Sequence, residues 1–181
     1  MHRHECGAPE YFTGCKLIPL PTLNGKIHPE QLQACLKQFG DPPHMVLPRV
    51  LSLTQCTELG TVYTLEETKV LAEIAHHHQL LLHMDGARLA NAVAFLGCSL
   101  KEATQEVGVD LLSFGGTKNG LLFGEAVVFF RSALAPHFPY IQKQGMQLAS
   151  KMRFLSAQFE ALFKEQLWLK NAQYANGMAK L

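Results

Sequence analysis

Two short apolar runs, residues 80–84 and 111–114, each end abruptly in a polar stretch that contains glycine. The first run stops at Asp85, with Arg88 close behind it, and the second stops at a Gly-Gly-Thr-Lys stretch whose last residue is Lys118. Short apolar runs bounded by turn residues are typical of strands that are covered on both faces of a parallel sheet. Because the carboxyl ends of parallel strands meet at one edge, Asp85, Arg88 and Lys118 are expected to share one crevice.

Segments with helical periodicity separate these runs. A capping box formed by Thr64 and Glu67 opens one predicted helix, which leads into residue 80. Residues 147–174 carry one apolar stripe and predict a single long amphipathic helix. The other predicted helices cover residues 29–39, 88–95 and 100–107; the other strands cover residues 50–55 and either an interrupted strand over 121–130 or a hairpin whose second arm is 126–130.

The alternation of strands and helices predicts an α/β fold with a mostly parallel sheet and flanking helices. The chain has 181 residues, enough for one domain with a real core. The predicted sheet has few strands, it follows an unanchored loop, and a long helix comes after it. We therefore interpret residues 1–181 as part of a larger domain.

Composition excludes several classes of partner. Lys and Arg number 16 against 15 Asp and Glu, so the net charge of +1 gives no electrostatic reason to expect nucleic acid or an anionic membrane surface. No apolar run approaches the roughly 20 residues of a membrane helix, and the first residues lack the apolar core of a secretion signal. Five cysteines without a CxxC pair fit reduced thiols. These features predict a cytoplasmic protein.

Nine histidines, three of them consecutive at residues 76–78, raise the question of a metal site. Adjacent residues on a helix point in different directions, so this triplet does not present three ligands to one ion. No metal is expected.

The predicted crevice combines an acid, a guanidinium and an amine, which is the chemistry of a pyridoxal phosphate site. The lysine would form a Schiff base with the cofactor, and the acid would keep the pyridine nitrogen protonated. Each residue also has an ordinary alternative. Asp85 could cap a helix or form a turn, Arg88 could pair with Glu66 or another surface acid, and Lys118 could be solvated.

The combination of motifs is more specific than its parts. The stretches His-Met-Asp-Gly-Ala-Arg-Leu at residues 83–89 and Ser-Phe-Gly-Gly-Thr-Lys-Asn-Gly-Leu at 113–121 resemble the threonine aldolase branch of the β-eliminating lyase and threonine aldolase group. Residues 5–10, 54–63 and 151–153 look like further segments of the same family in the right order. The resemblance implies a fold-type-I pyridoxal phosphate enzyme that cleaves β-hydroxy-α-amino acids such as threonine into glycine and an aldehyde.

The resemblance also implies roles for single residues. Lys118 would carry the cofactor, next to Thr117, and Asp85 would pair with the pyridinium nitrogen. Arg88 would lie beside the cofactor or the substrate carboxylate. Glu58, in the loop after the strand over residues 50–55, is a candidate for the base that removes the substrate's hydroxyl proton. Family sites lie at dimer interfaces, where Lys151 or Arg153 could reach a neighbouring subunit's phosphate, so a homodimer or homotetramer is expected.

Members of the family also have a preceding segment with a phosphate-binding cup and a stacking histidine, and a following small domain. Neither His2 nor His4 is assigned the stacking role, and residues 1–181 resemble the central part of the large domain only. Two alternatives stay open: β-elimination or transamination on the same scaffold, and a non-catalytic remnant that self-associates through exposed apolar surface.

Overall fold

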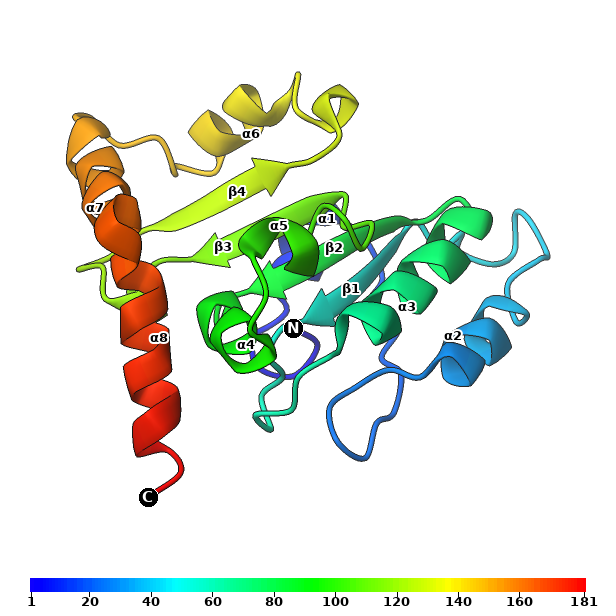
Figure 1. The fold of residues 1–181 in the computed structure, drawn as a ribbon. Coiled ribbons are helices and arrows are strands. Elements are labelled where there is room, and N and C mark those ends of the chain that lie inside the picture. The colour runs from blue at the N-terminus through cyan, green and yellow to red at the C-terminus, as the bar shows by residue number, and fades with distance from the viewer.

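The computed structural model describes residues 1–181 and contains one four-stranded sheet in the order β1-β2-β3-β4 (Figure 1). The first three strands are parallel, and β4 runs antiparallel to β3. This architecture confirms the predicted α/β fold, and it selects the hairpin from the two alternatives for residues 121–130. The strands are β1 (Val50–Thr54), β2 (Leu81–Gly86), β3 (Leu111–Gly115) and β4 (Glu125–Phe129).

Helices flank the sheet unevenly. Helices α3 and α4 lie on one face, while the N-terminal segment passes across the opposite face, and α7 and α8 form an arm beside the β3–β4 end (Figure 1). None of these helices combines the length and the hydrophobicity that spanning a membrane requires. The helices are α1 (Ala8–Thr13), α2 (Pro29–Leu36), α3 (Leu65–His77), α4 (Leu89–Leu96), α5 (Leu100–Ala103), α6 (Phe138–Gln144), α7 (Arg153–Phe163) and α8 (Leu167–Met178), with 3₁₀ turns η1 (Thr117–Asn119), η2 (Ser132–Leu134) and η3 (Lys164–Gln166).

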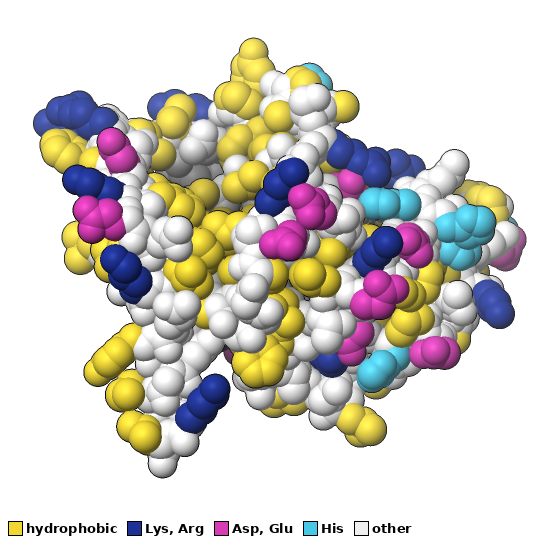
Figure 2. Space-filling view, viewed as in Figure 1, with side chains coloured by type: hydrophobic (Ala, Val, Ile, Leu, Met, Phe, Trp, Pro, Cys, Tyr) yellow, Lys and Arg dark blue, Asp and Glu magenta, His cyan; other side chains and the backbone are white.

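The core lies between the sheet and the helices on one face only. Burial alternates along β2: Leu82 and Met84 are fully buried, whereas His83 and Asp85 are half-buried. The expectation that this strand is covered on both faces is met in full only on the core face, because the second face is half-buried. Strands have a two-residue side-chain period, so the polar residues of β2 fall together on the second face. Figure 2 shows charged and histidine side chains gathered over α3 and α5, and hydrophobic ones where α7 meets the sheet.

Two predicted helices differ from the structure. The single helix predicted over residues 147–174 is wrong, because α7 starts at Arg153 and ends at Phe163. Glu165 and Gln166 then adopt left-handed backbone angles, with φ of 51° and 56°, and α8 starts at Leu167. The helix predicted over 100–107 is a single turn that ends at Ala103.

A buried carboxylate joins β2, α3 and the end of β4. The Asp110 side chain is 3% exposed. Its Oδ2 accepts a hydrogen bond from the Leu82 N–H at 2.7 Å and contacts His76 Nε2 at 2.9 Å. Its Oδ1 pairs with Arg131. This carboxylate thus satisfies a buried backbone donor in the middle of the sheet and ties the histidine triplet to the fold.

Gly115, the last residue of β3, lies against the backbone of Ala87. A Cβ atom at this position would come within 2.6 Å of Ala87 Cα and 2.7 Å of its carbonyl oxygen. We expect Gly115→Ala to lower the free energy of unfolding by about 1–3 kcal/mol, the usual cost of forcing atoms into a packed contact. Gly40→Ala, where nothing lies within 4 Å, is the matched control. Equal urea midpoints for the two variants would contradict this close approach.

Candidate functional site

The predicted site residues meet at the carboxyl edge of the parallel strands. Asp85 is the penultimate residue of β2, and its neighbours in register are Thr54 on β1 and Ser113 on β3. Arg88 precedes α4, and Lys118 lies in the 3₁₀ turn that follows β3. The structure thus brings the acid, the guanidinium and the amine to one edge, as the βαβ pattern predicts.

Asp85 keeps part of its carboxylate available. Its Oδ1 accepts a hydrogen bond from the Ala87 N–H at 3.0 Å, in the turn that leads to α4. Its other oxygen has no hydrogen bond in the structure, and the residue is half-buried. The local turn fixes the direction of the carboxylate, so one oxygen is presented to whatever lies at the edge of the sheet.

Arg88 pairs with Glu58 and not with Glu66. Its Nη1 and Nη2 donate to the two carboxylate oxygens of Glu58 at 2.9 and 3.3 Å, a two-pronged contact. The hydrogen bond and charge of Arg88 lower the pKa of Glu58, and Lys118 and His4 lower it further. The hydrogen bond from Arg88 to Glu58 in turn raises the pKa of Arg88. Lys118 is therefore close enough to act electrostatically on this ion pair.

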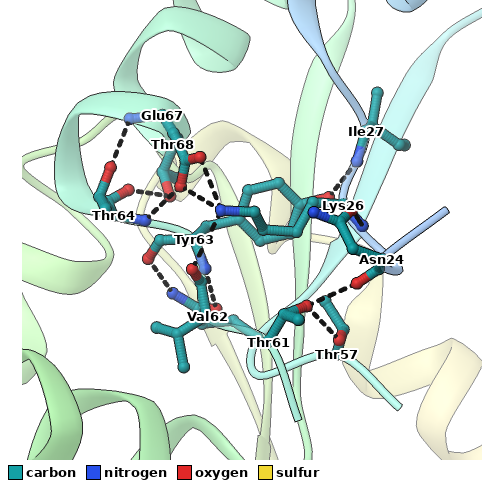
Figure 3. Close-up of polar contacts among 11 residues, drawn as sticks. Asn24, Lys26, Ile27, Thr57, Thr61, Val62, Tyr63, Thr64, Glu67 and Thr68 are labelled. Carbon is teal, nitrogen blue, oxygen red and sulfur yellow. Dashed lines mark hydrogen bonds and ion pairs between the residues drawn. The ribbon is translucent and has the colours of Figure 1, made fainter. Parts of the chain in front are cut away.

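The loop that carries Glu58 is held at its base. The buried side-chain amide of Gln55 donates to the Tyr63 carbonyl at 2.8 Å and accepts from the Tyr63 N–H at 3.0 Å. This pair closes the loop as a strand partner would. The phenol oxygen of Tyr63 accepts from the Ile27 N–H at 2.6 Å, and burial raises the pKa of Tyr63 to about 12. Figure 3 shows this tyrosine between its own loop and the segment that carries Lys26 and Ile27.

A second set of contacts holds the tip of the loop. The hydroxyls of Thr57 and Thr61 are 2.7 Å apart, and Thr61 donates to the Asn24 carbonyl at 2.7 Å (Figure 3). Lys26, from the same N-terminal turn, pairs with Glu67 at 2.6 Å and also donates to the Val62 carbonyl. Because these contacts fix the loop at its base and at its tip, the fold itself positions Glu58 for Arg88.

The Lys118 turn is anchored by α8. Asn119 is buried, and its side-chain amide donates to the Trp168 carbonyl at 2.9 Å. Asn171 donates to the Asn119 carbonyl at 2.8 Å. The Lys118 side chain itself is exposed and has neither a hydrogen bond nor an ion pair in the structure. The amine is thus free, while the backbone beneath it is held.

Two other predicted residues have local contacts. The Thr117 hydroxyl accepts from the Gly124 N–H at 3.1 Å, which closes the loop between β3 and β4. Arg153 is exposed at the start of α7, and its guanidinium lies over the Phe154 ring at 4.8 Å. That Thr117 and Arg153 contact a cofactor stays a prediction.

His83 is the site residue that sequence reasoning missed. It lies two residues before Asp85 on the same face, and its ring contacts Ser52 and Ser113. Burial lowers the pKa of His83, and the negative charge of Asp85 offsets only part of this effect. The alternation of Leu82, His83, Met84 and Asp85 was the available signal, because it places both polar residues on one face of the strand.

The lowered pKa of His83 predicts a pH dependence of stability. Between the native pKa and the unfolded value near 6.5, the unfolded chain binds a proton that the native chain does not. Stability should therefore fall as the pH drops below 6.5, and this contribution should vanish in His83→Gln. Urea unfolding of both chains at pH 7.5 and 5.5 measures it; identical pH dependence in the two chains would contradict the prediction.

Curated relatives align with this sequence over nearly its whole length. Low specificity L-threonine aldolases of Pseudomonas sp. (strain NCIMB 10558) and Pseudomonas aeruginosa are 47% and 48% identical to it over 178 residues. Each alignment covers 98% of this chain and 51% of the relative. The chain therefore spans about half the length of the curated relatives it matches.

Solved structures and a family model show similarity to the same group of proteins. The structure of Leishmania major threonine aldolase superimposes with a TM-score of 0.91 at 34% identity, over 98% of this chain and 52% of that chain. A structure from Listeria monocytogenes, with a TM-score of 0.70 at 21% identity over 95% of this chain and 45% of that one, shares the fold. The model described as beta-eliminating lyase matches residues 1–180. The family that the motifs predict is confirmed: this chain belongs to the beta-eliminating lyase family.

Proposed function

We propose that residues 1–181 form part of a pyridoxal phosphate-dependent lyase that cleaves β-hydroxy-α-amino acids, such as threonine, into glycine and an aldehyde. One observation carries the proposal: Asp85, Arg88 and Lys118 meet at the carboxyl edge of the sheet. The chain that brings them together is 47% identical to a low specificity L-threonine aldolase. Because it spans about half of that relative, the proposal concerns the part of the site that these residues build.

The side chains at this edge fit the chemistry of the cofactor. The unoccupied oxygen of Asp85 can accept a hydrogen bond from a protonated ring nitrogen, and its charge favours that proton. Lys118 offers an exposed amine without a competing partner, as bonding to the cofactor's aldehyde requires. When bound, the cofactor supplies an electron sink for the negative charge that develops at Cα.

Glu58 is better suited to orient Arg88 than to remove a proton. Its lowered pKa and its two contacts with the guanidinium make its carboxylate a weak base. Held in this way, Arg88 presents a fixed, permanently charged group beside Asp85, suited to the cofactor or to a substrate carboxylate. We therefore propose that Glu58 positions Arg88, and that the substrate's hydroxyl proton goes to another acceptor.

Product analysis tests the reaction class. We expect a full-length lyase that contains these residues, incubated with pyridoxal phosphate and L-threonine, to release glycine and acetaldehyde in equal amounts, measured by chromatography and by a coupled reduction of the aldehyde. Arg88→Lys keeps the charge but loses the two-pronged contact, so turnover should fall about tenfold or more. Lys37→Arg, in an exposed turn, is the control.

The description of the family model favours β-elimination as the second candidate function. This reaction would convert threonine to ammonia and a keto acid. Recovery of these products without glycine would contradict the aldolase proposal and support the alternative.

We further propose that the chain works in the cytoplasm as a homodimer or homotetramer. All five cysteines are free in the structure, which fits a reducing compartment. Large apolar side chains are exposed along α6 and β4, including Tyr140 at 69% and Ile141 at 61%. Arg153 has no acidic partner and could reach a neighbouring subunit's phosphate. Sedimentation velocity tests the assembly; a strictly monomeric chain at all concentrations would contradict it.

A further inference from the structure

A row of polar side chains crosses the three parallel strands beside Asp85. Ser52 on β1 and His83 on β2 are direct neighbours in register. Asp85 lies two residues farther along β2, and its direct neighbour on β3 is Ser113. Since side chains alternate between faces along a strand, these four share the face opposite the buried core.

The imidazole of His83 spans the strands on either side of it. Its Nδ1 and Ser52 Oγ share a hydrogen bond of 2.8 Å, and its Nε2 and Ser113 Oγ share one of 3.1 Å. The ring thus reaches back to β1 and forward to the residue beside Asp85. Both ring nitrogens make hydrogen bonds, so the His83 side chain ties β2 to both neighbouring strands two residues before Asp85.

A neutral ring satisfies this arrangement. Neutral imidazole donates from one nitrogen and accepts at the other, and each serine hydroxyl can do either. Burial of His83 favours the neutral form. Of the two cations at this edge, Arg88 is engaged by Glu58, and Lys118 makes no ion pair with Asp85. The charge of Asp85 is therefore left for a partner at the open edge of the sheet.

We infer that His83, held between Ser52 and Ser113, is a positioning residue that fixes the end of β2, and with it the place of the Asp85 carboxylate, for the ring nitrogen of pyridoxal phosphate. The inference rests on the proposed function, because it names the residue that orients the acid of that site. A residue with a merely structural role would only need to fill the space on this face of the sheet. An apolar side chain of similar size at residue 83 would preserve packing on this half-buried face but would remove both bonds that hold the strands around Asp85.

The test uses the full 181-residue chain and pyridoxal phosphate as the probe. His83→Leu should weaken cofactor binding, titrated by absorbance, about tenfold, the size expected for loss of one or two partly buried hydrogen bonds. Its thermal midpoint should stay near that of the parent, because the gain from replacing a desolvated imidazole with an apolar group offsets the loss of the two hydrogen bonds to Ser52 and Ser113. His83→Gln, whose amide also offers a donor and an acceptor, should restore most of the affinity. His77→Leu, on the exposed side of α3, is the matched control and should bind as the parent does.

A second readout does not depend on cofactor binding. In the cofactor-free chain, the ¹³C resonance of the Asp85 carboxyl should shift in His83→Leu and Ser113→Ala, but not in His83→Gln or His77→Leu. If the parent chain binds no cofactor at Lys118, the proposed function fails, and this resonance alone decides the inference. If His83→Leu does not fold, Ser52→Ala and Ser113→Ala provide the same comparison. An unchanged resonance, or parental cofactor affinity in the variants that break the bridge, would overturn the inference.

Discussion

Replacing Lys118 with alanine should abolish the specific attachment of pyridoxal phosphate to this chain. The amine of Lys118 is the only group proposed to bond to the cofactor's aldehyde, so no other side chain should compensate. The new visible absorbance that develops when the parent chain is titrated with the cofactor should be absent. The fold should persist, with stability changed by less than about 0.5 kcal/mol, because the Lys118 side chain has no hydrogen bond or ion pair to lose.

Lys69→Ala is the matched control for this experiment, since Lys69 is an exposed lysine on α3. It should keep the parental spectrum and thermal midpoint. Equal spectral changes in the parent, Lys118→Ala and Lys69→Ala would show that the cofactor attaches without selection, and the assignment of Lys118 would be abandoned.

The largest effect on stability is expected at Asp110. Asp110→Ala leaves the buried Leu82 N–H without its acceptor and removes the partner of both His76 and Arg131. We expect a loss of about 3 kcal/mol in the free energy of unfolding, the size typical of breaking a buried, hydrogen-bonded ion pair. For a domain of ordinary stability this is a large share of the total. Urea unfolding followed by circular dichroism measures it.

Two further variants separate the parts of the Asp110 effect. Arg131→Ala should cost less than Asp110→Ala, because the Arg131 side chain is 50% exposed and its pair is partly solvated. Asp41→Ala, at an exposed turn, should be nearly neutral. If Asp110→Ala unfolds at the same urea concentration as Asp41→Ala, the anchoring role of Asp110 is wrong.

Local patterns were enough to predict the sheet and the meeting of the three principal site residues. The apolar runs that contain Leu82 and Leu112 form neighbouring parallel strands. Their polar ends meet because a βαβ unit places the carboxyl ends of its parallel strands at the same edge of the sheet. The capping box of Thr64 and Glu67 formed as predicted. Each of these features depends on residues that lie close together in the chain, so a single sequence is enough to predict it.

Features that depend on contacts between distant residues were not predictable in this way. Glu58 meets Arg88 because the hydrogen bonds between Gln55 and Tyr63 close the loop that carries Glu58. The break between α7 and α8 at Glu165 and Gln166 has no glycine or proline to mark it. Tertiary packing explains this break. Leu162, before it, and Trp168, after it, are both buried, so both helices contribute to the same core.

The most direct test of the central claim is to map where pyridoxal phosphate attaches to the unaltered chain. The chain is mixed with a limiting amount of cofactor and reduced with borohydride, and the modified peptides are identified by mass spectrometry. We predict that the added mass lies on the peptide that contains Lys118. Modification spread over exposed lysines such as Lys69, Lys143 and Lys180, with no preference for Lys118, would contradict the account.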